Sequence, residues 1–193
     1  MAAAVPGARR GLSTGVIVGI VGGALTLVLL VVAVVVGVVV LGTDTIKLTA
    51  AGVSMEPTIR SGQTVSATKV DPGEYRPKHG DIVVFTAPAG WLAVAGDQMV
   101  IKRVIGLPGE RLACCDPKGR WTIGGTPLDE PYVKAGSASA GVPFDVIVPD
   151  GRLWVMGDNR AASNDSSTMF GQTRDIGVAT IRVSTVSAVV KPS

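Results

Sequence analysis

The distribution of apolar and polar residues divides the chain into two unlike parts. From Gly15 to Leu41 no residue is charged, and only Thr26 is polar. A helix over this stretch would be about 40 Å long at ~1.5 Å per residue, which exceeds the ~30 Å hydrocarbon core of a bilayer. A cleavable secretory signal has an apolar core of only roughly 7 to 15 residues, closed by a small-residue cleavage site. Because nothing of that kind closes this run, the pattern predicts an uncleaved transmembrane helix over residues 15–42.

The charged residues on either side of this helix predict its orientation. Arg9 and Arg10 precede it with no acidic residue nearby, and such basic ends remain cytoplasmic. We therefore expect a cytoplasmic tail over residues 1–14, a single pass through the cell membrane, and an extracytoplasmic domain over residues 43–193. That domain carries the remaining 16 of the 18 basic residues and all 15 acidic ones. Its charge is close to neutral, which gives no reason to expect nucleic acid binding.

The polar and apolar pattern changes to short runs after the helix. These runs are rich in Val, Ile and Thr, are interrupted by Gly, Pro and Asp, and show no sustained helical period. We expect strands within residues 44–50, 80–88, 98–110, 145–149, 152–159 and 178–190. The Gly-Gly pair in "RWTIGGTPLDE" (120–130) predicts a hairpin, and "AGSASAGVP" (135–143) predicts a flexible loop. The fold class is therefore mainly β, an extracytoplasmic barrel or sandwich behind the transmembrane helix.

The two cysteines, Cys114 and Cys115, are adjacent in the sequence. Neighbouring Cα atoms lie ~3.8 Å apart, below the ~4.4 to 6.8 Å typical of a disulfide. An extracytoplasmic location permits a bond between them, while free thiols and intermolecular pairing remain open. The pair lacks the additional ligands of a structural zinc site. Nothing else in the sequence calls for a metal or an organic cofactor.

Ser54 in "GVSMEPTIR" is a candidate nucleophile. A serine hydroxyl needs an adjacent base to act as one. The one histidine, His79, leaves a Ser-His-Asp triad open, but it directly precedes a predicted strand in a polar context. A lysine can also act as the base if burial lowers its pKa by roughly three units from ~10.4. Lys102 lies in the apolar run "MVIKRVI", where strand alternation places Val100 and Val104 on its face. The alternative is a solvent-facing Lys102 on an edge strand.

A resemblance to a known family favours the buried lysine. The stretches "GVSMEPTI", "GDIVVF", "IKRVIGLPGE" and "GDNRAASNDS" resemble, in order, four sequence blocks of bacterial type I signal peptidases, particularly those of Gram-positive and actinobacterial type. The resemblance spans residues 52–166 and explains residues 116–149 least, so we expect a more variable region there. It implies a membrane-anchored serine endopeptidase that removes signal peptides from secretory preproteins, cutting after small residues at positions −3 and −1.

The resemblance also implies roles for individual residues. Ser54 would be the nucleophile, with its backbone N–H in the oxyanion hole, and Lys102 the general base. Ser163 would form a hydrogen bond with that lysine, while Asp158, Asp165 and Arg103 would support the site. The implied substrate pocket is formed by Met55, Ile59 and Ile101, although Met55 is equally consistent with core packing. Arg160 is either part of the same charge network or a solvated loop residue.

Two positions depart from the family pattern. In some members the position of Gly52 is a serine whose hydroxyl adds an oxyanion donor. A glycine at this position is common in Gram-positive relatives. Ser167 replaces an arginine, which removes a cationic partner that Asp165 would otherwise have. The partners implied are preproteins and the lipid bilayer, with the oligomeric state undetermined. Two other functions remain open: a Ser/Lys peptidase with one dedicated substrate, and a non-catalytic tethered β-domain that binds exported polypeptides.

Overall fold

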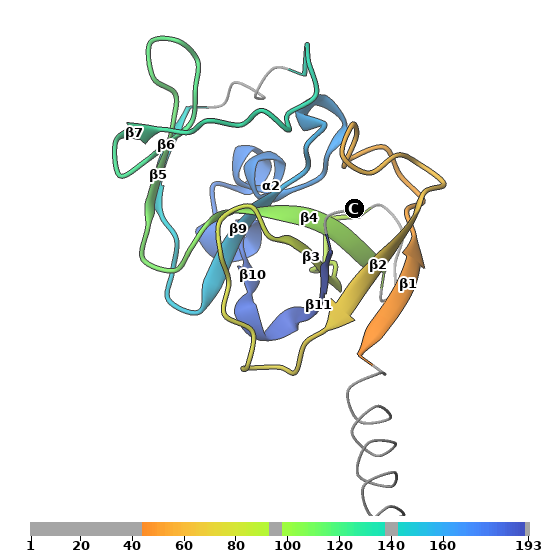
Figure 1. Ribbon diagram of the computed structural model, residues 1–193. Helices are drawn as coiled ribbons and strands as arrows, with labels where there is room; N and C mark the ends of the chain where they lie inside the picture. Colours follow the sequence, from red (N-terminus) through yellow and green to blue (C-terminus); the bar gives the residue numbers. More distant parts are fainter. Residues whose placement is uncertain (1–43, 93–97, 138–142, 192–193) are drawn as a thin grey trace, which may run out of the picture. The chain divides into compact units, whose positions relative to one another are not determined.

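The short Val, Ile and Thr runs form two antiparallel β-sheets (Figure 1). The computed structural model describes residues 44–92, 98–137 and 143–191, all within one compact unit, Asp44–Ser193. The predicted tail (1–14) and transmembrane helix (15–42) lie outside the described residues, as does most of the predicted loop over 135–143. In the described part of the chain, no helix combines the length and the apolar character needed to span a bilayer.

The main sheet has seven strands and is strongly curved (Figure 1). Its order is β1 (Thr45–Thr49), β2 (Thr64–Lys69), β11 (Val186–Val190), β3 (Ile82–Thr86), β4 (Met99–Gly106), β9 (Arg152–Met156) and β10 (Ile181–Arg182). Strand β4 therefore lies between β3 and β9 and is not an edge strand. The alternative of Lys102 on an exposed edge strand was wrong, because neighbouring strands pair with both sides of β4.

The second sheet is small, and most of it falls in the region that the sequence marks as variable. Its order is β7 (Thr126–Pro127), β6 (Thr122–Ile123), β5 (Arg111–Cys114) and β8 (Phe144–Ile147). The predicted hairpin is confirmed: Gly124 and Gly125 connect β6 to β7 with φ of 56° and 84°. Two consecutive positive φ angles suit a two-residue hairpin turn, and glycine adopts them without steric cost. Cys114 and Cys115 form a disulfide at the end of β5.

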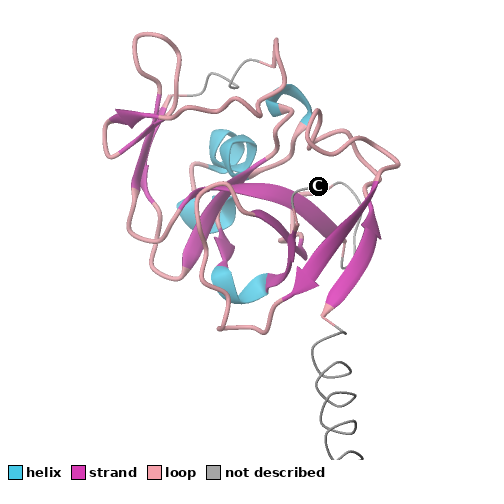
Figure 2. Cartoon of the chain, viewed as in Figure 1, coloured by secondary structure: helices cyan, strands magenta, loops and turns pink. Residues whose placement is uncertain are grey.

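The mainly β prediction is confirmed, but the sequence did not predict the helices within the described residues of the domain (Figure 2). These are α2 (Ser166–Thr173), α3 (Ile176–Ala179), and the 3₁₀ turns η1 (Arg160–Ala162) and η2 (Val183–Thr185). The predicted strand over 178–190 is instead the end of α3, β10, η2 and β11. These four helices in the described part of the chain have eight residues or fewer, too few for a helical period to emerge from the sequence. The available signals for these helices were the N-cap residues Asp165 and Asp175. Their carboxylates accept hydrogen bonds from the first-turn N–H groups of α2 and α3.

Two hydrophobic clusters pack on the main sheet. The larger contains Trp91, Trp121 and Trp154, which are 1%, 2% and 0% exposed, and it extends to the second sheet through Leu112 and Phe144. The smaller lies among β2, β3 and β11 and receives side chains from the loop between β1 and β2. Residues of β4 contribute to both clusters: Val104 belongs to the larger, and Ile101 packs against the smaller.

Candidate active site

Ser54 lies in the loop that connects β1 to β2. Backbone hydrogen bonds between Ala50 and Gln63 and from Gly62 to Ala50 close the base of this loop. Met55 and Ile59, only 3% and 2% exposed, insert into the smaller hydrophobic cluster. Two buried apolar anchors directly after the serine hold the loop in place, so that Ser54 itself remains half-buried.

Lys102 extends from the middle of β4 toward this loop. Its Nζ lies 2.8 Å from Ser54 Oγ and 3.3 Å from the carbonyl oxygen of Ile101. The side chain is 4% exposed and lies opposite Val83 of β3, a member of the larger cluster. Burial therefore lowers the pKa of Lys102, although the negative charges of Asp165 and Asp158 oppose this shift. A lowered pKa favours the neutral amine that a general base requires.

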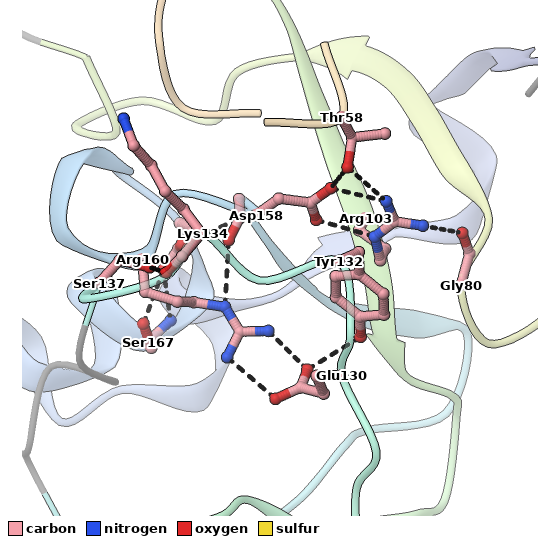
Figure 3. Close-up of polar contacts among 12 residues, drawn as sticks. Thr58, Gly80, Arg103, Glu130, Tyr132, Lys134, Ser137, Asp158, Arg160 and Ser167 are labelled. Carbon is pink, nitrogen blue, oxygen red and sulfur yellow. Dashed lines mark hydrogen bonds and ion pairs between the residues drawn. The ribbon is translucent and has the colours of Figure 1, made fainter. Parts of the chain in front are cut away.

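Arg103, the next residue of β4, points away from Lys102 and pairs with Asp158. Arg103 Nε and Nη2 donate to the two carboxylate oxygens of Asp158 at 2.8 and 2.6 Å, and Thr58 Oγ1 donates to the same group at 2.5 Å (Figure 3). The Asp158 residue is fully buried, where a carboxylate needs such partners. This ion pair connects the Lys102 strand, the Asp158 segment after β9 and the loop of Ser54.

Gly157 lies against both Ser54 and Ser163, and its N–H connects it to Asp165. The Asp165 carboxylate accepts hydrogen bonds from the N–H of Gly157 and from both the N–H and the hydroxyl of Ser167. Ser167 thus supplies donors to Asp165 in place of an arginine. A side chain at Gly157 would collide with the Ser54 carbonyl oxygen and with Ser163, so glycine is required there. The Ser163 hydroxyl is buried and has no hydrogen-bond partner among the described residues, including Lys102.

Three residues of the site were not identified from the sequence. Glu130 forms a bidentate ion pair with Arg160, which is 5% exposed and therefore not a solvated loop residue. The Tyr132 ring lies against the Arg103 guanidinium, and Lys134 pairs with Glu56 at 2.9 Å. All three belong to the variable region, where no residue spacing indicated that the chain returns to Ser54.

Other sequence candidates take up different positions. His79 is half-exposed and pairs with Glu110, whereas the hydroxyl of Ser54 contacts Lys102. The alternative of a Ser-His-Asp triad that contains Ser54 and His79 is therefore wrong. Met55 and Ile59 pack in the smaller cluster, and Ile101 is partly buried against it; their role in a substrate pocket stays a prediction. Among the described residues no group of acidic, histidine or cysteine side chains has the arrangement of a metal site.

The geometry as a whole suits nucleophilic acyl transfer. A serine hydroxyl in hydrogen-bond contact with a buried lysine is an activated nucleophile once the amine is neutral. The Ser54 carbonyl accepts from the N–H of Asn159, whereas its own N–H has no hydrogen-bond partner in the described residues. That N–H is available as a donor to an oxyanion formed at the serine.

Comparison with known proteins gives the family. The profile of the family described as "Signal peptidase, peptidase S26" matches residues 23–185, and the chain belongs to this family. It is 34% identical over 152 residues to a probable signal peptidase I of Mycobacterium leprae, covering 58% of this chain and 52% of that one. It is 35% identical over 136 residues to signal peptidase I V of Bacillus subtilis, covering 64% of this chain and 75% of that one.

A solved structure is similar as well. A signal peptidase I from Enterococcus faecalis is 27% identical, with a TM-score of 0.46, over 61% of this chain and 98% of that chain. The present chain spans about half the length of the mycobacterial relatives it matches.

Proposed function

We propose that this chain is a membrane-anchored serine endopeptidase that removes signal peptides from secretory preproteins. In this proposal the apolar run over residues 15–42 anchors the chain in the cell membrane. Arg9 and Arg10 keep the N-terminus cytoplasmic, so the domain over residues 43–193 acts on the extracytoplasmic side. The proposed substrates carry small residues at positions −3 and −1, as the family resemblance implies.

The proposed reaction passes through an acyl-enzyme. Neutral Lys102 accepts the Ser54 proton as Oγ attacks the scissile carbonyl, and the protonated lysine then delivers a proton to the leaving amine. The developing oxyanion accepts a hydrogen bond from the Ser54 N–H. A water activated by Lys102 then hydrolyses the acyl-enzyme, which regenerates both side chains. No metal or organic cofactor takes part in these steps.

One observation carries the proposal: the 2.8 Å contact between Ser54 Oγ and a lysine that is 4% exposed. A buried lysine without a carboxylate in direct contact is energetically unfavourable, because the charged form loses its hydration. The two carboxylates whose charges act on Lys102 form their hydrogen bonds with other groups. Asp158 accepts from Arg103, and Asp165 accepts from Gly157 and Ser167. This isolation favours the neutral amine and supports the role of Lys102 as the base.

The test is cleavage of a purified preprotein by the detergent-solubilised full chain. We expect a cut after the small-x-small site, which both Ser54→Ala and Lys102→Ala abolish. Ser61→Ala, in the same loop but exposed, and Lys69→Ala, exposed on β2, are the matched controls and retain cleavage. Binding of the preprotein without cleavage would contradict the peptidase and favour a polypeptide-binding domain. Cleavage that survives Lys102→Ala would exclude this lysine as the base.

A further inference from the structure

A segment of the variable region contacts the separate chain segments that contribute the candidate catalytic residues. This segment, residues 128–137, follows β7 and is named here the 128–137 strap. Its Lys134 N–H donates to the Asp158 carbonyl oxygen at 2.9 Å, and the Lys134 side chain pairs with Glu56, two residues after the nucleophile. The Ser137 hydroxyl donates to the carbonyl oxygen of Lys134 and stabilises the turn at this point (Figure 3).

Tyr132 connects the strap to the strand of Lys102. The centre of its ring is 4.0 Å from the Arg103 guanidinium carbon, the geometry of a cation–π contact. Arg103 is thus held between the Tyr132 ring and the Asp158 carboxylate (Figure 3). Burial, followed by the charge of Glu130, raises the pKa of Tyr132, so its hydroxyl keeps its proton and donates to Glu130 at 2.9 Å.

Glu130 extends the same network to the segment after β9. Its carboxylate accepts two hydrogen bonds from Arg160, whose Nε donates to the Gly157 carbonyl oxygen at 3.1 Å. Gly157 in turn lies directly against Ser54 and Ser163. A continuous series of contacts therefore runs from Arg103 through Tyr132, Glu130 and Arg160 to the backbone beside the nucleophile.

We infer that the 128–137 strap is a positioning element of the catalytic site, with Tyr132 as its principal residue. Tyr132 fixes the Arg103 guanidinium on Asp158, and Glu130 fixes Arg160 on Gly157. The Ser54 and Lys102 side chains are thereby held at reacting distance by a segment that contains neither. This inference rests on the proposed peptidase function for its kinetic consequences, but its geometric content concerns the environment of Lys102 and can be measured without substrate.

The test compares Tyr132→Leu, which removes the ring from Arg103, with Tyr132→Phe, which keeps the ring and loses only the hydroxyl. In the full chain we expect Tyr132→Leu to lower kcat for preprotein cleavage by about 10- to 100-fold with little change in KM, as for a small misplacement of reacting groups. In Tyr132→Leu, Arg103 is held less firmly and offsets the negative charge of Asp158 less well, while the effect of Asp165 on Lys102 does not change. The pKa of Lys102 is therefore expected to rise. The acid limb of the kcat/KM profile therefore moves to higher pH. Tyr132→Phe is expected to stay close to the parent.

A second variant and a second measurement guard against loss of folding. Glu130→Gln keeps the size of the side chain and an acceptor for Tyr132 but weakens the pair with Arg160, so a smaller loss of kcat is expected. Because this substitution removes a negative charge, the Lys102 titration midpoint is not expected to rise. Asp145→Asn, which removes an exposed ion pair with Arg111 in the second sheet, is the matched control without effect. Titration of the ¹⁵N-labelled Lys102 amine, assigned by its loss in Lys102→Met, reports on the site in the absence of turnover.

The outcomes separate the two proposals. If the parent chain does not cleave preproteins, the peptidase proposal fails, while a higher Lys102 titration midpoint in Tyr132→Leu still supports the strap. If the parent cleaves but both variants keep its kcat and Lys102 titration, the strap inference is overturned. A lower unfolding temperature with unchanged kinetics would likewise show that the strap only stabilises the fold.

Discussion

Arg103 and Asp158 form a doubly hydrogen-bonded ion pair directly beside Lys102, with distances of 2.8 and 2.6 Å and with Asp158 fully buried. The pair brings together two charges that act in opposite directions on the pKa of Lys102. Burial lowers the pKa of Lys102, while the negative charges of Asp165 and Asp158 oppose that shift and favour the charged form. Burial outweighs the two carboxylates, so the pKa of Lys102 is lowered, and the Arg103 guanidinium lies on the Asp158 carboxylate, where it offsets part of that charge.

The first prediction concerns the removal of Arg103. Arg103→Leu leaves the Asp158 carboxylate buried and unpaired, which we expect to cost about 3 to 5 kcal/mol of unfolding free energy. Chemical denaturation of the full chain measures this loss. Arg111→Leu, which breaks an exposed pair, should change the free energy by less than about 1 kcal/mol. Equal losses in the two variants would show that the buried pair is no more important than a surface one.

The second prediction concerns Lys102 and pH. The folded pKa of Lys102 is lowered, so the folded state binds fewer protons than the unfolded state between the two pKa values, and stability rises with pH in that window. We expect Lys102→Met to abolish cleavage yet to unfold at no lower temperature at neutral pH, because a buried apolar chain carries no desolvation penalty. The variant should also lose part of the pH dependence of stability between the folded pKa of Lys102 and its ordinary value. Thermal unfolding across this range measures both effects, and a marked destabilisation at neutral pH would contradict the account.

The third prediction concerns Gly157. Gly157→Ala introduces a methyl group against the Ser54 carbonyl oxygen and Ser163, so the nucleophile loop or the Ser163 segment must move. Overpacking of this kind costs about 1 to 3 kcal/mol, and we expect cleavage to fall sharply. The matched substitution Gly52→Ala meets no atom within 4 Å and should leave the unfolding temperature unchanged. Full cleavage by Gly157→Ala would show that the backbone beside Ser54 tolerates displacement.

The fourth prediction tests Ser163, whose predicted hydrogen bond to Lys102 is not formed in this structure. A buried hydroxyl without a partner contributes little to folding, so Ser163→Ala should be neutral or slightly stabilising. If the hydroxyl orients Lys102 during the reaction, the same variant lowers kcat while the unfolding temperature holds. Ser166→Ala is the contrasting control, because the Ser166 hydroxyl accepts from the Val155 N–H at 2.9 Å and its loss should destabilise the fold. Unchanged kcat in Ser163→Ala would exclude a catalytic role for this serine.

Much of this protein could be predicted from local sequence. Short runs rich in Val, Ile and Thr predicted β3, β4, β8 and β9, and the Gly124-Gly125 pair predicted the hairpin, because strand propensity and turn geometry depend on near neighbours along the chain. Strand alternation placed Val100 and Val104 on the face of Lys102, and both pack with the larger core. The resemblance to signal peptidases singled out Ser54 and Lys102, which are 48 residues apart.

The tertiary structure alone decided what surrounds these residues. Whether Lys102 is buried depends on β3 and β9 pairing with both sides of β4, and strand order is not encoded in the period of any one strand. The contacts of Tyr132 with Arg103 and of Glu130 with Arg160 join residues about 30 positions apart and connect the strap to β4 and to η1. They form because the second sheet directs the 128–137 strap back over the site, and a side-chain contact of this kind leaves no periodic pattern in the sequence. The sequence by itself thus singled out Ser54 and Lys102 as the candidate catalytic pair, and the packing of distant segments determined the buried environment of Lys102.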